Sequence, residues 1–195
     1  DTDDTYDEPL FQRVIEYAAG ADRDVVDMVS GHPDWEPPEP LRQGLEAYAG
    51  ADVDAFQYPP SEGLSDLRAE IAARRGVEES RVLVTNGAGE ANYLALAEAL
   101  DRGAGSEVLM TDPVYPYYPG RTTMLGGETT RVPVRDDCHV DVAAMREAAS
   151  TDTAAIVLNT PNNPTGAVSP RETVAELADV ASEVDALLLV DEVYD

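Results

Sequence analysis

An aspartate that ends a strongly apolar run is the first residue of this sequence whose position suggests chemistry. Residues 186–190 are five apolar residues in a row, Asp191 follows them directly, and Tyr194 comes three residues later. Such a run predicts a strand buried on both faces of a parallel sheet. Asp191 would then lie at the carboxyl edge of the sheet, where α/β proteins bind ligands. Taken alone, it can equally be a capping or ion-paired carboxylate.

A loop rich in asparagine and proline follows another apolar run. Residues 159–166 read Asn-Thr-Pro-Asn-Asn-Pro-Thr-Gly, with three asparagines and two prolines among eight residues. Prolines fix the backbone, so this loop is predicted to be rigid, with its amide side chains pointing outward. Loop asparagines are usually turn formers, but the string Asn-Pro-Thr-Gly is specific. It makes Asn163 a candidate binding residue.

Two further junctions between a strand and a loop carry candidate binding residues. Residues 86–89 place Ala88 and Gly89 at the start of a predicted helix, where free backbone N–H groups can bind an anion. A plain tight turn explains the same residues, as does a diphosphate site in a nucleotide-binding domain. Tyr115, positioned by Pro113 and Pro116, could lay its ring against a planar ligand or belong to the core.

The elements that would position these residues alternate between strands and helices. Strands are predicted at 81–85, 107–111, 129–134, 154–159 and 186–190, and helices at 90–100, 142–149 and 170–182. Upstream, helices are predicted at 6–20, 38–49 and 64–76, with a strand-like run at 25–29. Residues 112–120 are read as a loop. This alternation predicts an α/β fold with a mostly parallel sheet covered by helices on both faces.

Composition excludes several classes of partner. The chain has 39 acidic and 13 basic residues, all of the latter arginine, and a net charge of −26. Such a surface repels nucleic acid and anionic lipid, and no apolar run is long enough to span a membrane. Scattered acids without lysine favour a halophilic protein, whose self-repulsion concentrated salt would screen. A single cysteine, Cys138, fits a reducing cytoplasm, the start of the chain does not resemble a signal peptide, and no metal site is predicted.

Taken together, these motifs resemble a known family over nearly the whole chain. The sequence is similar to the first half of a class I/II aminotransferase, an enzyme of fold type I that depends on pyridoxal 5′-phosphate (PLP). The resemblance is carried by residues 31–35 (Gly-His-Pro-Asp-Trp), Tyr58 with Gly63, residues 85–91, residues 113–115, residues 159–166 and residues 191–194.

The resemblance implies a role for each candidate. Ala88 and Gly89 would hold the PLP phosphate through backbone N–H groups, although Gly89 lacks the hydroxyl that the family often has there. Tyr115 would stack on the pyridine ring, Asp191 would bind its nitrogen and keep it protonated, and Asn163 and Tyr194 would hydrogen-bond its phenolic oxygen. Tyr58 would reach the phosphate of a neighbouring subunit in a homodimer, and Gly31 would lie near the substrate carboxylate.

The implied reaction moves an amino group between an amino acid and a 2-oxo acid. Lyases, synthases and decarboxylases share these motifs, and so would a ligand-binding module that has lost its chemistry. A nucleotide-binding domain would leave the Asn-Pro-Thr-Gly loop and Asp191 unexplained. The family also needs a lysine to form a Schiff base with PLP, and arginine cannot replace it.

Because this chain contains no lysine, it has no catalytic residue of that kind, and it is expected to be a fragment that is inactive alone. Residues 1–50 would form an N-terminal arm and part of the smaller domain. Residues 51–195 would form the first part of the PLP-binding large domain.

Overall fold

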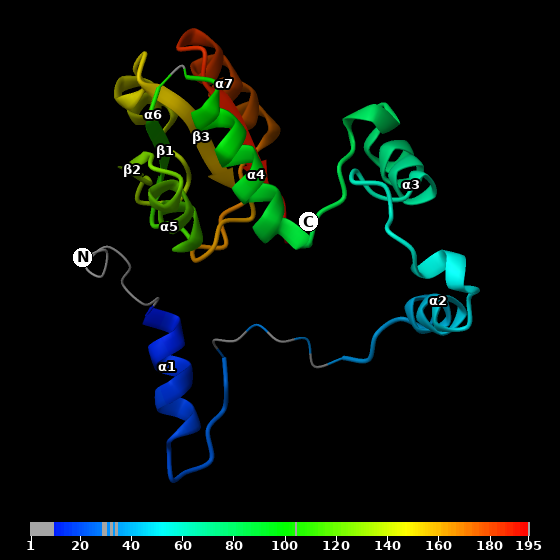
Figure 1. Cartoon of the computed structure of the whole chain (residues 1–195). Helices are drawn as coiled ribbons and strands as arrows, with labels where there is room; N and C mark the ends of the chain where they lie inside the picture. The colour runs from blue at the N-terminus through cyan, green and yellow to red at the C-terminus, as the bar shows by residue number, and fades with distance from the viewer. Residues whose placement is uncertain (1–9, 29–30, 32, 34, 104, 195) are drawn as a thin grey trace. The chain divides into compact units, whose positions relative to one another are not determined.

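The computed structural model describes residues 10–28, 31, 33, 35–103 and 105–194. These form two compact units, with the division between Val84 and Thr85 (Figure 1). His32 and Asp34 of the predicted motif lie outside the described residues, as do the part of the first predicted helix before residue 10 and the end of the strand-like run at 25–29. The predicted domain boundary after residue 50 remains a prediction.

The first unit is helical in its described residues. Its elements are α1 (Leu10–Ala19), α2 (Glu39–Ala49), the 3₁₀ turn η1 (Val53–Phe56), α3 (Ser65–Arg75) and the 3₁₀ turn η2 (Glu79–Arg81). The predicted helices at 38–49 and 64–76 are confirmed as α2 and α3. Helix α3 ends where Gly76 adopts a left-handed conformation, with φ +66°, which glycine allows without a steric penalty.

Two predicted strands of this region are absent from the described residues. Residues 25–28 form no strand, and the side chains of Val26 and Met28 are largely exposed. Residues 82–85 follow η2 without joining a sheet, and the Val84 N–H instead donates to the Glu62 carbonyl at 2.9 Å. Both stretches have strand-like composition, but a strand requires a partner ladder that neither has here.

The second unit contains a four-stranded sheet in which every pairing is parallel. Its strands are β1 (Glu107–Asp112), β2 (Glu128–Pro133), β3 (Thr153–Asn159) and β4 (Leu187–Asp191), in the order β2-β1-β3-β4. Helix α4 (Gly87–Asp101) leads into β1, and three helices connect successive strands, namely α5 (Tyr117–Met124), α6 (Val142–Ala148) and α7 (Arg171–Glu183). Because the strands are parallel, β1, β3 and β4 deliver the residues that follow them to one edge of the sheet.

Helices cover both faces of this sheet, as predicted (Figure 1). On one face, Leu109 and Ile156 pack against Met145 of α6 and Leu177 of α7. On the other face, the strand residues Val108, Met110, Ala155 and Val157 pack against α4 and α5 residues, chiefly Leu96, Ala99 and Tyr118. Successive strand residues alternate between the two clusters, as the pleat requires. The structure therefore confirms the α/β fold class.

Strand β4 differs from its prediction. Leu187, Leu188 and Leu189 are only half-buried and Val190 is exposed, so β4 is not buried on both faces. The physical reason is its place at the edge of the described sheet, where one side has no neighbouring strand. The strand with the predicted burial is β3, whose seven residues are all buried.

Helix α5 is absent from the sequence prediction, which read residues 112–120 as a loop. Its prolines caused the error, because Pro116 is the N-cap and Pro119 lies in the first turn of the helix. Proline is tolerated there, since the N–H groups of a first turn have no intrahelical partner.

Candidate functional site

Asp191 ends β4 with a buried carboxylate that three donors hold in place. Its Oδ2 accepts hydrogen bonds from the Tyr118 hydroxyl at 2.5 Å and from Asn92 Nδ2 at 2.7 Å. Its Oδ1 accepts the Val193 N–H at 3.0 Å. These donors come from α5, α4 and the turn after β4, so the carboxylate is fixed by three different segments. Such fixation suits a group that must present its charge in one direction.

A second chain of hydrogen bonds connects β4 to the asparagine-rich loop. Asn159 Nδ2 donates to the Asp191 carbonyl at 3.1 Å, and Asn159 Oδ1 accepts the Asn163 N–H at 2.7 Å. Asn163 Nδ2 in turn donates to the Tyr194 hydroxyl oxygen at 3.0 Å. The structure thus brings together three of the predicted site residues, Asn163, Asp191 and Tyr194, through Asn159.

The predicted anion site is the first turn of α4. Gly87, Ala88 and Gly89 begin the helix, and the N-cap residue Asn86 makes no side-chain capping bond. The Asn86 N–H is instead accepted by the Glu90 carboxylate at 2.6 Å. Asn92, which donates to Asp191, lies in the same helix. The N-terminal part of α4 therefore provides both this donor and the free N–H groups of Ala88 and Gly89.

Tyr115 lies in a cluster of tyrosine rings beside Asp191. Its ring centroid is 4.7 Å from that of Tyr117 and 6.3 Å from that of Tyr118, which it meets edge to face. Burial, with a smaller contribution from Tyr117, raises the pKa of Tyr115 to about 12. Burial and the hydrogen bond to Asp191 raise the pKa of Tyr118 well above its ordinary value. Both phenols therefore stay protonated at neutral pH, and Tyr118 remains a donor to Asp191.

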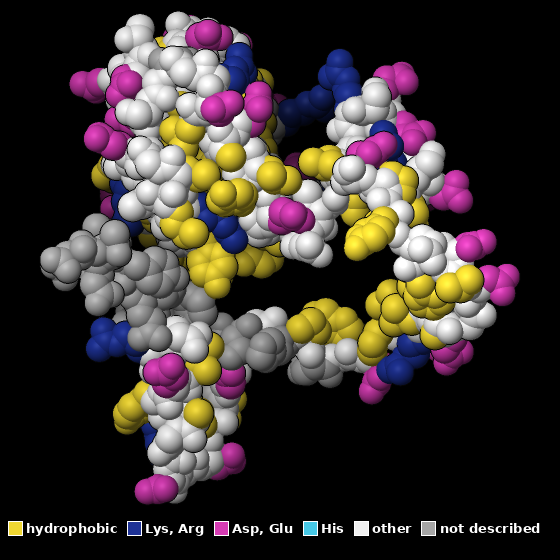
Figure 2. Space-filling view, viewed as in Figure 1, with side chains coloured by type: hydrophobic (Ala, Val, Ile, Leu, Met, Phe, Trp, Pro, Cys, Tyr) yellow, Lys and Arg dark blue, Asp and Glu magenta, His cyan; other side chains and the backbone are white. Residues whose placement is uncertain are grey.

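The other two predicted site residues belong to the first unit. Gly31 has a φ of +60° and no atom within 4 Å of the position of a Cβ, and Tyr58 has a fully exposed side chain. Exposed hydrophobic side chains gather along α2 in the same unit, where Figure 2 shows them in yellow, among them Leu41 and Leu45. The roles of Gly31 and Tyr58 remain predictions.

Three residues of the site were missed by the sequence analysis as contributors, namely Asn92, Tyr118 and Asn159. Asn92 comes one helical turn after Gly89, and Tyr118 comes three residues after Tyr115. Once α4 was recognised as a helix, the spacing of Gly89 and Asn92 could have indicated that these two residues share a face. Asn159 stands in the quoted motif, but only the structure shows that it links Asp191 to Asn163.

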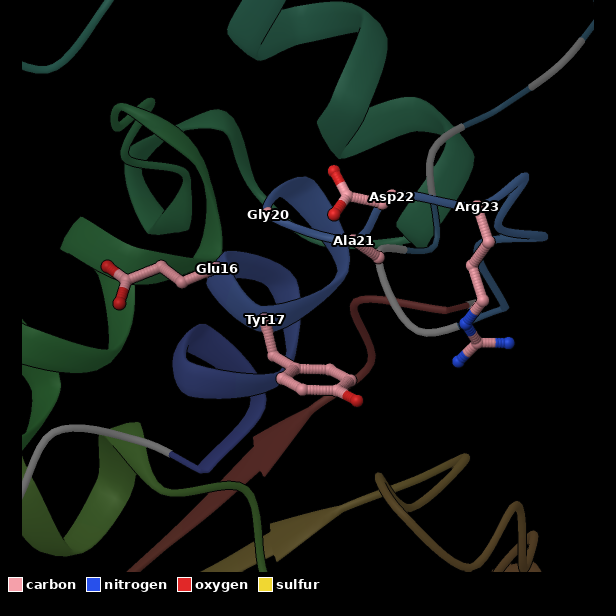
Figure 3. Close-up of a pocket in the computed structure, with 6 residues that line it drawn as sticks. All are labelled: Glu16, Tyr17, Gly20, Ala21, Asp22 and Arg23. Carbon is pink, nitrogen blue, oxygen red and sulfur yellow. The ribbon is translucent and has the colours of Figure 1, made fainter.

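A separate hollow of about 490 Å³ lies at the end of α1 in the first unit. It is lined by Glu16, Tyr17, Gly20, Ala21, Asp22 and Arg23, none of which is a predicted site residue. Figure 3 shows the side chains of Glu16, Asp22 and Arg23 pointing in different directions. Binding sites bring polar groups together, so this hollow lacks the features of one.

No described helix is both long enough and apolar enough to cross a membrane. No cluster of three potential metal ligands occurs among the described residues.

Comparison with known families assigns the chain. The sequence model of the family "Aminotransferase class I and II" matches residues 23–195. The chain belongs to this family. The match includes every predicted site residue, from Gly31 to Tyr194, and so confirms the resemblance drawn from the motifs.

Similar proteins span about twice the length of this chain. A probable N-succinyldiaminopimelate aminotransferase of Mycobacterium tuberculosis is 37% identical over 87% of this chain and 44% of its own length. An aspartate aminotransferase of Pyrococcus horikoshii is 30% identical over 95% of this chain and 47% of its own. Among solved structures, a double mutant of Thermus thermophilus aspartate aminotransferase has a TM-score of 0.86 and 30% identity, covering 97% of this chain and 52% of that one.

Proposed function

We propose that the protein is a PLP-dependent aminotransferase that moves an amino group between an amino acid and a 2-oxo acid. The chain spans about half the length of the relatives it matches, so this activity belongs to the protein at its natural length. The observation that carries the proposal is the Asp191 carboxylate, which is buried and fixed by donors from three segments at the carboxyl edge of a parallel sheet.

The donor set around Asp191 fits the pyridine nitrogen of PLP. A carboxylate offers about four lone-pair positions, and the Tyr118, Asn92 and Val193 donors use three of them. The position that remains is on Oδ1 and can accept one further N–H. A buried carboxylate beside the ring nitrogen would hold a proton on that nitrogen, because each charge stabilises the other. With PLP bound, the chemistry supplied at this place would be the withdrawal of electrons from the substrate's α-carbon.

The pair formed by Asn163 and Tyr194 fits the phenolic oxygen of the ring. Asn163 uses one N–H for the Tyr194 oxygen, which leaves its second N–H and the Tyr194 hydroxyl proton free to donate. Two donors at one oxygen would stabilise negative charge there. Asn159 fixes the position of this pair relative to Asp191, so the oxygen and the nitrogen of the ring would be bound by one connected network.

The remaining contacts would orient the cofactor. The N–H groups of Ala88 and Gly89 would hold its phosphate at the start of α4. The ring of Tyr115 is kept in place by packing against Tyr117 and Tyr118 and would cover one face of the pyridine. Covalent attachment and proton transfer at the α-carbon require a lysine amine. The 195 residues contain none, so we assign that lysine to a segment outside this sequence.

We further propose a homodimer in which Tyr58 reaches the phosphate bound by its partner, and a site in which Gly31 lies near the substrate carboxylate. The side chain of Tyr58 is fully exposed, so it is available to contact a partner subunit. The single free cysteine, Cys138, is compatible with the cytoplasm.

The function is tested with the protein at its natural length. Purified protein is supplied with PLP, single amino acids and a 2-oxo acid as the amino acceptor, and products are separated by chromatography. Stoichiometric formation of a new amino acid and a new 2-oxo acid is expected. Release of carbon dioxide or ammonia without transfer would instead identify a decarboxylase or lyase, and unchanged substrates would identify a binding module.

A further inference from the structure

One arginine near the predicted phosphate site lacks an anionic partner. Only two of the arginines that the structure describes, Arg68 and Arg121, are partly buried. Arg68 donates to the carbonyls of Val82 and Glu79 at 3.0 and 2.9 Å, and two carboxylates lie within 4 Å of it. Within the described residues, the guanidinium of Arg121 forms neither a hydrogen bond nor an ion pair, and it contacts the Tyr117 ring. A half-buried cation without a counter-charge is costly, so an anion at this place would stabilise it.

The guanidinium of Arg121 lies against the first turn of α4. It stacks over the Tyr117 ring, with its central carbon 5.0 Å from the ring centroid. A Cβ built on Gly89 would come within 3.1 Å of Arg121 Nη2. The guanidinium therefore occupies the space that a side chain at position 89 would use. The stack on Tyr117 restricts where it can move, so its position is defined in advance of any ligand.

The sign of the surrounding charge supports an anion at this place. The Gly87 N–H donates to the Thr85 carbonyl at 2.8 Å, so helix α4 contributes the N–H groups of Ala88 and Gly89 and the positive end of its dipole. The acid of that turn, Glu90, already accepts the Asn86 N–H and forms no ion pair with Arg121. A phosphate between α4 and Arg121 would accept from both, and a guanidinium can bind two of its oxygens at once.

We propose that Arg121 binds the phosphate of PLP and replaces the hydroxyl that Gly89 lacks. This inference rests on the proposed function. It explains why glycine stands at position 89, because a hydroxyl-bearing side chain there would meet the guanidinium. Arg121 would therefore bind the phosphate from α5, whereas the N–H groups that bind it belong to α4.

The test compares the affinity of the natural-length protein for PLP and for pyridoxal, which lacks the phosphate. Dissociation constants are measured from the absorbance change on titration. Arg121→Gln is expected to weaken PLP binding by about 10- to 100-fold, as for loss of a hydrogen bond to a charged group, and to leave pyridoxal binding unchanged. Arg131→Gln removes an exposed arginine of β2 and should change neither constant. The double variant Arg121→Gln with Gly89→Ser should regain part of the PLP affinity.

The outcomes separate this inference from the proposed function. If the wild-type protein does not bind PLP, the proposed function and the role of Arg121 are both overturned. If it binds PLP and Arg121→Gln binds it equally well, only the role of Arg121 is overturned. An equal loss for PLP and pyridoxal would mean that Arg121 only supports packing. Unchanged PLP affinity with a raised KM for an acidic substrate would mean that it binds a substrate carboxylate instead. Each of these last two results also overturns the proposal.

Discussion

Asp191 is the residue at which local structure and chemistry are most closely connected. Three donors fix its carboxylate, and the hydrogen bonds to its own carbonyl from Asn159 Nδ2 and the Thr160 N–H fix its backbone. Its orientation is therefore set before any ligand binds. A group held in this way stabilises charge without having to reorganise, which is the usual source of large electrostatic effects in enzymes.

Replacement of Asp191 by asparagine should preserve the fold and remove the activity. The amide keeps the shape of the side chain but cannot hold a proton on the cofactor nitrogen, so kcat is expected to fall by on the order of 100-fold or more. The measurement is steady-state transamination at natural length, with circular dichroism to verify folding. Asp112→Asn changes an exposed carboxylate at the end of β1 and serves as the matched control. Turnover within a few-fold of wild type would remove Asp191 from its proposed role.

The raised pKa of Tyr118 predicts that the folded protein loses stability in alkali. This pKa is raised above the ordinary value of 10.0, chiefly by burial and then by the Asp191 hydrogen bond. The folded state thus retains the phenolic proton where the unfolded state has lost it. The contribution is complete below pH 10.0 and is lost as the pH rises through the folded-state value. The absence of lysine removes the other group that usually titrates in this range.

Tyr118→Phe should therefore make the unfolding free energy less dependent on pH between about pH 9 and about pH 11. Urea unfolding followed by circular dichroism at several pH values gives the slope. Tyr17→Phe, in an exposed position of α1, should retain the wild-type slope. If both variants lose stability in alkali as steeply as wild type, the pKa of Tyr118 does not contribute.

At the scale of elements, β3 is the structural centre of the second unit. All seven of its residues are buried, and it pairs with β1 on one side and β4 on the other. Ile156→Ala should lower the unfolding free energy by about 2–5 kcal/mol, because the cavity between β3 and α7 cannot close completely. Urea denaturation measures the change. Val168→Ala, at an exposed loop position, should cost less than about 0.5 kcal/mol, and equal costs would contradict this account of the core.

How far the sequence could predict each element depended on where its partners lie. Strands β1 and β3 and helix α7 carry their own periodic signal, so they were found within a residue or two of their bounds. Residues 82–85 also have the composition of a strand, but composition does not reveal whether a partner is present. Helix α5 was hidden by Pro116 and Pro119, which are harmless only because they fall at its beginning.

The residues of the candidate site could likewise be predicted only where their signal is local in the sequence. Asp191, Asn163 and Tyr194 could be found because each lies in a motif that is local in sequence. Tyr118 and Asn92 could not, because their importance lies in contacts with a residue 73 and 99 positions away. Such contacts depend on how α4 and α5 pack against β4, which no local pattern specifies.

At the scale of the molecule, the predicted homodimer can be tested by mixing damaged subunits. Subunits with Tyr58→Phe are combined with subunits carrying Asp191→Ala, unfolded together and refolded. If Tyr58 acts on the partner's site, each mixed dimer has one intact and one doubly damaged centre. Random mixing should then restore about a quarter of the wild-type activity. Each variant refolded alone is the control, and activity no higher than theirs would contradict the shared site.

The net charge of −26 predicts that salt stabilises the protein. Like charges repel one another in the folded state more than in the expanded chain, and salt screens this repulsion. The unfolding free energy should rise between about 0.1 M and about 2 M KCl. Thermal unfolding followed by circular dichroism gives the comparison, with sorbitol at equal osmolality as an uncharged control. Full stability in dilute buffer would refute the halophilic interpretation.

Because the strands are parallel, mutations at the carboxyl edge of the sheet and mutations at the opposite edge should have different effects. The segments that follow β1, β3 and β4 carry Tyr115, Asn163 and Tyr194, whereas the turns that lead into β2, β3 and β4 carry exposed residues such as Gly126, Asp152 and Asp185. Mutations at the first edge can alter which molecules are accepted, while those at the opposite edge lie away from Tyr115, Asn163 and Tyr194. A gene with this layout can acquire a new specificity while its core stays unchanged, and an engineer can insert a tag at the second edge without disturbing the first.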